Sequence, residues 1–265
     1  MTEAALATQA ASGERAPDRR VFRITGADRE SFLQGLVSND LRKLAAGPVY
    51  AAFLTAQGKY LADFLLIPEP DAILLDIKGT IAEAFTRRLS MYRLRADVQI
   101  TPTEIHVWRG LGPAPVAAVP DPRDANLGWR LYTAAEGPAT ADPIDWDAIR
   151  VAACIPETGV ELIPDDTYIL EAGFERLNGV DFRKGCYVGQ EVTARMKHKT
   201  ELRKGFRTVL VEGSAPVGTE LLADGKPAGT LYTQSGGKGI AFLRFDRAQG
   251  EMLAGDARVT LPPAE

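Results

Sequence analysis

The sequence is poor in the residue types that build several common kinds of site. It has two cysteines, Cys154 and Cys186, and two histidines, His106 and His198. Two cysteines are too few for a scaffold held together by several disulfides. A structural zinc site takes four Cys or His ligands, and an iron–sulfur cluster bound by this chain alone would also be short of thiolates. The sequence therefore predicts no metal site of its own.

Other common signatures are absent from the sequence as well. No run approaches the roughly 18 apolar residues of a membrane-spanning helix, so we expect no contact with a membrane. There is no Gly-x-x-x-x-Gly-Lys-Ser/Thr phosphate loop, no strand-linked Gly-x-Gly-x-x-Gly and no Gly-x-Ser-x-Gly elbow. Neither histidine has the context of a Ser-His-Asp triad. These absences argue against the common nucleotide-binding and serine-hydrolase classes.

The composition is that of an ordinary globular protein. The 265 residues are 45% hydrophobic and 25% charged, enough for one large domain or two modest ones. A net charge of −4 predicts no direct binding of nucleic acid. Between Arg183 and Arg207, however, eight basic residues accompany only two acidic ones. A basic segment on an acidic body indicates an anionic ligand or partner at one place, although a merely solvated face would have the same composition.

The order of patterns along the chain predicts an α+β protein. Residues 1–20 are Ala-rich, polar and aperiodic, which predicts a disordered tail, and they lack the apolar stretch of a secretory signal, which predicts a cytoplasmic protein. Helical and strand patterns alternate over residues 21–200, with a clear hairpin at residues 50–67 around Gly58. Short strands separated by glycine-containing turns over residues 201–265 are typical of a small antiparallel barrel.

The most informative segment is Lys184-Gly185-Cys186-Tyr187-Val188-Gly189-Gln190-Glu191. Its glycines permit a turn that approaches a ligand closely, and the cations before Cys186 favour the thiolate over the thiol. These features suit a reactive, partly exposed Cys186, but a buried cysteine that packs as a small apolar residue is the usual case, and the local pattern leaves both interpretations open. Cys154, with valine, alanine and isoleucine as neighbours, is predicted to lie in the core.

Two carboxylates occur in apolar surroundings and are candidate ligand contacts. Glu171 lies in Leu170-Glu171-Ala172-Gly173, and Asp63 lies in an apolar strand pattern. Burying a carboxylate is costly unless it has a partner, and the adjacent N–H donors of a pterin or purine would supply one. The alternatives are a solvent-facing glutamate at a helix start and an aspartate on the exposed face of a half-buried strand.

The segment 184–191 resembles the signature of the YgfZ-type folate-binding proteins. These are relatives of the glycine-cleavage T-protein, an aminomethyltransferase, and their mitochondrial counterparts serve iron–sulfur cluster maturation. The resemblance covers roughly residues 21 to 250. It continues in order through Phe32–Asp40, Asp121–Arg123, Leu127–Arg130, Ile163–Gly173 and Thr193–Arg195.

The resemblance implies a T-protein-like ring of three parts around a central channel that takes tetrahydrofolate. Residues 21–200 would form two intertwined α+β subdomains that bind folate, and residues 201–265 a C-terminal antiparallel β-barrel. Glu171 falls on the glutamate that holds the pterin in T-protein, and the basic segment would face the anionic tail of the folate. The further folate-contacting positions that we expect are Asp63, Tyr187, Gln190 and Arg195.

By the same resemblance, Cys186 would act as a thiolate that engages a cluster, a metal or a partner thiol, tuned or anchored by Lys184 and Arg195. The implied function is a tetrahydrofolate-binding protein that supports assembly or repair of iron–sulfur clusters in client enzymes, including those that modify tRNA. Its expected partners are iron–sulfur proteins or assembly factors.

One departure from the T-protein pattern bears on catalysis. T-protein carries two adjacent aspartates after a Gly-Gly turn, and here Ala62 takes the place of the first, so that only Asp63 remains. We therefore expect no aminomethyl transfer. The competing interpretations are a folate-dependent one-carbon transferase and an assembly scaffold that no longer binds folate.

Overall fold

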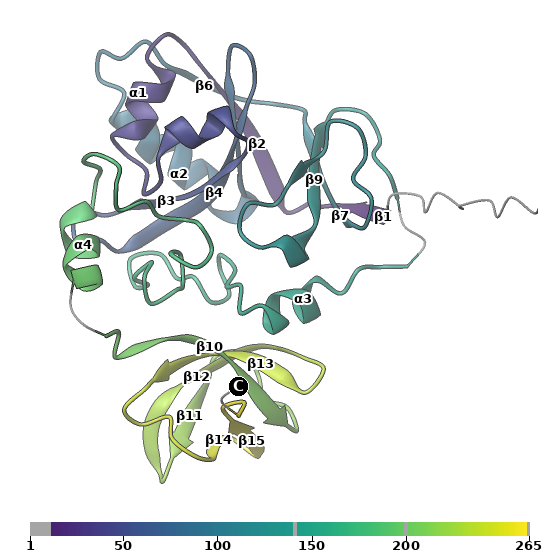
Figure 1. Cartoon of the computed structure of the whole chain (residues 1–265), viewed down its shortest axis with the longest axis vertical. Helices are drawn as coiled ribbons and strands as arrows, with labels where there is room; N and C mark the ends of the chain where they lie inside the picture. The colour runs from purple at the N-terminus through teal and green to yellow at the C-terminus, as the bar shows by residue number, and fades with distance from the viewer. Residues whose placement is uncertain (1–11, 140–141, 199–200, 264–265) are drawn as a thin grey trace, which may run out of the picture.

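The computed structural model describes residues 12–139, 142–198 and 201–263 of the chain. Figure 1 shows two sheets in the upper part of the molecule and a β-barrel below them, with α3 between. The residues from 12 to 198 are called the body here, and the closed sheet that follows is called the barrel. No helix in the described ranges is long and apolar enough to cross a membrane.

The larger sheet of the body is antiparallel, with the strand order β3-β4-β5-β2-β6. Its strands are β2 (Arg19–Thr25), β3 (Val49–Leu54), β4 (Tyr60–Pro68), β5 (Ile73–Lys78) and β6 (Gln99–Pro102). The hairpin predicted from the sequence is confirmed as β3–β4, and Gly58 in its turn has a φ of +75°, which glycine adopts without strain. Both strands are apolar and almost wholly buried, so the hairpin is a fixed centre for the body.

Helices cover one face of this sheet, and in α2 the spacing of apolar residues explains which side faces the sheet. The elements are α1 (Arg29–Gln34), the 3-10 helix η1 (Leu41–Ala45) and α2 (Gly79–Met91). Apolar residues three or four apart place Ala82, Phe85 and Leu89 on the buried side of α2. The ring of Phe85 lies 5.7 Å from that of Phe53 and 5.0 Å from that of Phe64, between centroids.

The smaller sheet corrects the prediction of a disordered tail over residues 1–20. Its strands are β1 (Ser12–Arg15), β7 (His106–Leu111), β8 (Val119–Pro120) and β9 (Trp129–Thr133), in the order β1-β7-β9-β8, with the 3-10 helix η2 (Ala125–Leu127) before β9. β1 pairs with β7, and Gly13 lies directly against the ring of Trp129. This strand depends on backbone pairing and close approach, so it has no apolar pattern in the sequence. Residues 1–11 lie outside the described residues.

The other face of the larger sheet packs on α3 (Trp146–Ala152) and on the turns of residues 153–189. The side chain of Asp145 caps α3 by accepting a hydrogen bond from the Ala148 amide at 2.8 Å. Buried apolar side chains from the turns, including Leu162 and Phe174, fill the space between sheet and barrel. The segment therefore acts as the packing layer that joins the two parts.

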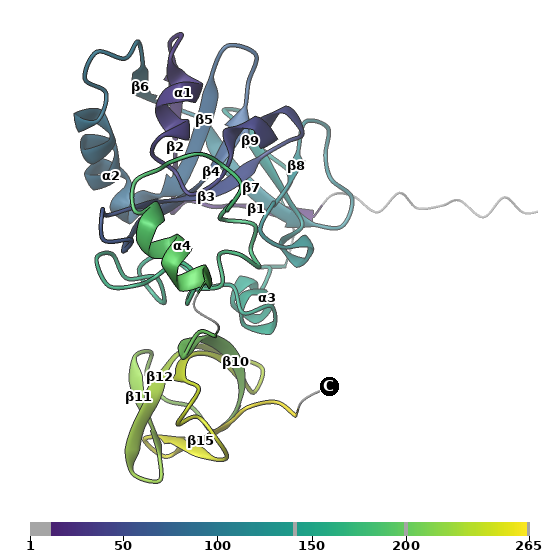
Figure 2. The same ribbon diagram turned by 60° about the vertical axis from the view of Figure 1, so that its left-hand side comes forward.

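The barrel is closed in the order β10-β13-β12-β11-β14-β15. Its strands are β10 (Lys204–Glu212), β11 (Thr219–Ala223), β12 (Lys226–Ser235), β13 (Lys238–Arg244), β14 (Met252–Ala254) and β15 (Ala257–Thr260). Alternate apolar residues such as Leu231 and Val259 point inward and are fully buried, as the sequence pattern predicted. α4 (Gln190–His198) belongs to the body and lies directly above the barrel (Figure 2).

Candidate functional site

Cys186 is exposed on a turn that precedes α4 and is anchored on both sides. On one side, the buried Lys184 directs its Nζ to three backbone carbonyl oxygens. Nζ donates to the oxygens of Gln34 at 2.8 Å and of Asn39 at 3.0 Å, and also to that of Val37. The three N–H donors of the ammonium are thus used to hold the segment that follows α1. Lys184 was expected to tune or anchor the thiol, and its three contacts make it an anchor for the turn.

The environment of Lys184 is costly for a charge. Burial lowers the pKa of Lys184 to about 8, against the attraction of Asp40 and Asp181. At neutral pH the side chain is still an ammonium, and its three carbonyl acceptors compensate for the lost hydration. Such a group holds one backbone geometry firmly, because any displacement would leave a buried charge without its acceptors.

The second anchor is formed by Tyr187 and Gly189. Tyr187 is buried, its burial raises the pKa of its phenol, and Lys184 Nζ lies 5.0 Å from its ring centroid. Gly189 has a φ of +84°, and a Cβ there would lie 2.6 Å from the carbonyl oxygen of Thr55. Only glycine lets the turn lie this closely on the tip of the β3–β4 hairpin. Cys186 is therefore presented to solvent by a backbone fixed on either side of it.

Cys154 has a different environment. It is half-buried after α3, among the apolar residues that pack on the main core. Burial raises the pKa of the Cys154 thiol, and the nearby charge of Arg176 only partly opposes this. A thiol in this setting is a poor nucleophile and metal ligand at neutral pH. The predicted contrast between the two cysteines in their exposure is present in the structure.

The basic segment predicted from the sequence is divided in the structure, so it is not one anionic-ligand surface. On α4, Arg195 pairs with Glu191 at 2.6 Å, and Lys197 pairs with Glu175. Lys184 is buried, and Lys199 lies outside the described residues. The acids that neutralise the segment come from elsewhere in the chain as well as from α4 itself, which a count along the sequence misses. Gln190 is partly exposed at the start of α4, and the structure brings neither Gln190 nor Arg195 to Glu171 or Asp63.

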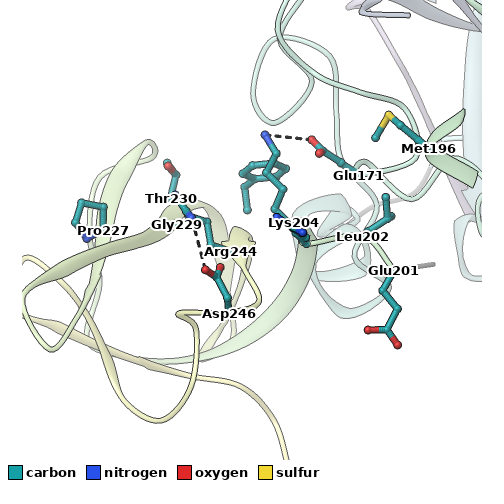
Figure 3. A pocket seen from close by; sticks show the side chains of 12 residues that line it. Glu171, Met196, Glu201, Leu202, Lys204, Pro227, Gly229, Thr230, Arg244 and Asp246 are labelled. Atoms are coloured by element: carbon teal, nitrogen blue, oxygen red, sulfur yellow. Dashed lines mark ion pairs between the residues drawn. The ribbon is translucent and has the colours of Figure 1, made fainter. Parts of the chain in front are cut away.

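Glu171 faces a wide cleft of about 960 Å³, called the outer cleft here. It lies between the end of α4 and the barrel strands β10, β12 and β13 (Figure 3). The carboxylate of Glu171 is 10% exposed, and its Oε2 lies 3.6 Å from Lys204 Nζ. Burial raises the pKa of Glu171, and the charge of Lys204 offsets this only in part. The lining residues are Glu171, Met196, Glu201, Leu202, Arg203, Lys204, Pro227, Gly229, Thr230, Phe242, Arg244 and Asp246.

Asp63 lines a separate inner cavity of about 30 Å³, which shares no lining residue with the outer cleft. The carboxylate of Asp63 accepts hydrogen bonds from the hydroxyls of Tyr50 at 3.0 Å, Tyr60 at 2.7 Å and Thr158. The volume suffices for about one water molecule, so a pterin does not fit there. Asp63 and Glu171, both expected to contact folate, thus line two different cavities, and the structure does not bring the two carboxylates together.

The inner cavity is closed by a network of buried ion pairs. Asp121 accepts hydrogen bonds from Arg130 at 2.7 Å and from Arg123 at 2.8 Å, and Arg130 also reaches Asp76 at 3.0 Å. Asp76 accepts a further bond from Arg19 at 2.6 Å. Burial disfavours ionisation of Asp121, but the charges of Arg123 and Arg130 outweigh it and hold the Asp121 pKa well below its usual range. The network ties the two sheets of the body together.

The fold is that of a glycine-cleavage aminomethyltransferase. The structure of glycine cleavage system aminomethyltransferase T from Bartonella henselae matches with a TM-score of 0.71 at 15% identity, over 94% of this chain and 84% of that one. The family profile described as CAF17, C-terminal beta-barrel domain, matches residues 203–265. The fold class predicted from the sequence, a T-protein-like α+β fold with a C-terminal barrel, is confirmed.

Two curated relatives identify the family to which the chain belongs. Both are named iron-sulfur cluster assembly factor IBA57, mitochondrial. The mouse (Mus musculus) protein is 32% identical over 278 residues, which cover 88% of this chain and 78% of the relative. The human (Homo sapiens) protein is 33% identical over 276 residues, with the same two coverages. The chain belongs to the IBA57 family.

Membership of the IBA57 family corrects one prediction. The relatives are named as mitochondrial, which contradicts the cytoplasmic location expected from residues 1–20. That expectation came from the lack of a secretory-type apolar stretch, and such a lack does not distinguish between compartments inside a cell.

Sequence reasoning missed the ion network of this IBA57-family chain. Arg130 and Asp76 are 54 residues apart, so no local pattern announces their contact. The one local signal was Asp121-Pro122-Arg123, in which the arginine donates to the aspartate two residues before it. In the described ranges no group of three or more His, Cys, Asp or Glu side chains is placed to hold a metal ion.

Proposed function

We propose that this chain is an iron–sulfur cluster assembly factor that works through the thiol of Cys186. The observation that supports this is the exposure of Cys186 between the buried anchors Lys184 and Tyr187. The thiol would release its proton to solvent, and the sulfur would then coordinate an iron atom of a cluster in transit. Clusters of the common types are held by about four protein ligands, so the other ligands come from a partner protein. Its clients would be iron–sulfur enzymes, including those that modify tRNA.

The fixed backbone around Cys186 suits this role. The ammonium of Lys184 and the contact of Gly189 with Thr55 hold the turn from both ends. A sulfur on a fixed turn loses little conformational freedom when a cluster binds, so more of the binding energy is retained. A cysteine on a flexible loop would bind a cluster more weakly.

The chain offers a matched control, because its other cysteine differs in burial. A thiol reagent at neutral pH should label Cys186 well before Cys154. Cys186→Ser should keep the thermal stability of the parent protein but fail to restore iron–sulfur enzyme activities in cells that lack the native protein. Cys154→Ser should restore them. Preferential labelling of Cys154, or full restoration by Cys186→Ser, would overturn the proposal.

We further propose that the chain binds tetrahydrofolate, in the manner of the YgfZ-type proteins, in the outer cleft. The volume of about 960 Å³ lies in the range of ligand pockets. Met196, Leu202 and Phe242 supply apolar surface for a ring, and Glu171 supplies a charged acceptor for pterin N–H groups. Arg203 and Lys204 are placed in the same lining for the anionic tail. Bound tetrahydrofolate would supply a carrier for one-carbon units.

Calorimetric titration with tetrahydrofolate tests this second proposal separately from the first. We expect micromolar affinity or weaker, which corresponds to about −8 kcal/mol. If neither heat nor a fluorescence change is observed, the protein is better described as an assembly scaffold that no longer binds folate. That result would leave the proposed role of Cys186 unaffected.

A folate-dependent one-carbon transferase is the competing function. Asp63, the only aspartate left of the T-protein pair, is closed in by three hydroxyl groups and lies outside the cleft that could hold folate. We therefore expect no aminomethyl transfer with glycine-cleavage components. Turnover of methylene-tetrahydrofolate at about 1 per second or faster, the range of ordinary enzymes, would establish the transferase instead.

A further inference from the structure

An arginine cluster lies at the end of α2 and in the residues that follow it. Between Glu83 and Asp97 the chain has four arginines and no acid. All four side chains belong to exposed residues, and none forms an ion pair within the described part of the chain. They are Arg87, Arg88, Arg93 and Arg95. On a protein of net charge −4, such a cluster produces a local positive field.

Exposed apolar side chains occur among these arginines. Met91 is 65% exposed and Leu94 is 90% exposed. Beside them lies a groove of about 350 Å³, called the α2 groove here. It is lined by Phe53, Leu61, Ile81, Ala84, Phe85, Arg87, Arg88, Met91, Pro164 and Asp165. The floor is thus apolar, and the charged lining residues are Arg87, Arg88 and one acid, Asp165. Exposed apolar surface bordered by charge is typical of interaction sites.

The α2 groove and the Cys186 turn are supported by the same hairpin. Phe53 on β3 and Leu61 on β4 line the groove. The tip of that hairpin, at Thr55 and Gly58, is in close contact with Gly189. A protein bound in the groove would therefore rest on the element that also positions the turn carrying Cys186.

We propose that the α2 groove docks an acidic segment of a partner protein that inserts an apolar side chain between the arginines. Arginine and methionine are enriched at protein interfaces, because guanidinium groups bind carboxylates in a bidentate manner and methionine adapts to varied shapes. Nucleic acid would use the arginines but leave the apolar floor unfilled, so a peptide fits both features better. The proposal depends neither on the thiol chemistry nor on folate.

The test uses a fluorescein-labelled peptide that alternates Glu with Leu and Phe, and a second peptide with Gln at each Glu. The full-length protein should bind the acidic peptide more tightly than the Gln peptide, and the difference should shrink at high salt. The double variant Arg87→Glu, Arg88→Glu should weaken binding about tenfold, because like charges would face each other. Met91→Ser with Leu94→Ser should weaken it without any change in charge.

The barrel supplies a control of equal charge change. Lys226→Glu with Arg258→Glu alters two exposed bases far along the chain and should leave peptide affinity unchanged, as should Cys186→Ser. Absence of binding by the acidic peptide, or equal losses in the groove and barrel variants, would overturn the proposal. So would tighter, arginine-dependent binding of duplex DNA or of phosphatidylserine vesicles. A failed peptide test with an intact Cys186 phenotype would remove the docking surface alone.

Discussion

The inner cavity and the outer cleft of this protein differ in how their charges are arranged. In the inner cavity, of about 30 Å³, arginines and carboxylates alternate and are largely shielded from water. In the outer cleft, of about 960 Å³, charges such as Lys204 and Arg244 are about half exposed and have looser partners at 3.6 Å. The first arrangement holds the fold in place, and the second is open to a ligand.

The difference follows from solvation. A buried ion pair is stabilised only while both partners are present, because each charge has lost its water. An exposed pair is screened and contributes little.

The largest expected effect is the loss of the buried carboxylate of Asp121. Asp121→Ala would leave Arg123 and Arg130 buried without this counter-ion, and we expect a loss of about 3–5 kcal/mol in unfolding free energy, measured by urea denaturation. The matched variant in the outer cleft is Asp246→Ala, which removes a 60% exposed partner of Arg244 and should cost less than about 1 kcal/mol. Equal losses of unfolding free energy in the two variants would show that the inner network contributes no more to stability than an exposed ion pair does.

Tetrahydrofolate affinity should also distinguish the outer cleft from the inner cavity. Glu171→Ala should weaken tetrahydrofolate binding by about 1–3 kcal/mol, because the pterin donors lose a charged acceptor. Asp63→Asn should leave the affinity unchanged, since Asp63 lies in the other cavity. Calorimetry on both variants measures this, and an effect of Asp63→Asn larger than that of Glu171→Ala would reverse the assignment of the folate site.

Anchoring of the Cys186 turn can be measured in the same way. Lys184→Met would leave three backbone carbonyls without their donor, so we expect a loss of about 1–3 kcal/mol in unfolding free energy and a less ordered turn. Lys197→Met, which removes an exposed partner of Glu175 and a cation that lies 5.4 Å from the ring centroid of Phe182, should change stability by less than about 0.5 kcal/mol. Hydrogen exchange at residues 185–189 reports the order of the turn, and unchanged protection in Lys184→Met would contradict the anchoring role.

The smallest expected effect is a pH dependence. Burial raises the pKa of Glu171 above its ordinary 4.5, and only the ionised carboxylate is a charged acceptor for pterin N–H groups. On acidification, tetrahydrofolate affinity should therefore begin to fall at a higher pH than an ordinary glutamate would give. Titrations at several pH values should show a flatter profile for Glu171→Gln. Identical pH profiles for the two proteins would show that Glu171 does not contact the bound tetrahydrofolate.

Much of the fold was predictable because its signals are local. The β3–β4 hairpin follows from two apolar runs around Gly58, and the barrel follows from short alternating strands with glycine turns. The exposure of Cys186 was expected from its neighbouring glycines together with the family resemblance of the octapeptide, since a free cysteine alone is more often buried. In each of these cases the deciding interactions lie within a few residues along the chain.

The sequence by itself thus determined the hairpin, the barrel and the exposure of Cys186, together with the family resemblance of its octapeptide. Only the tertiary structure decided that Lys184 binds carbonyls near residue 37 and that Asp63 is closed off by Tyr50 and Thr158. It also decided that Ser12–Arg15 pairs with β7. The physical reason is common to all three. A buried polar group takes whatever partner the fold brings within hydrogen-bonding distance, and that partner can lie anywhere in the chain.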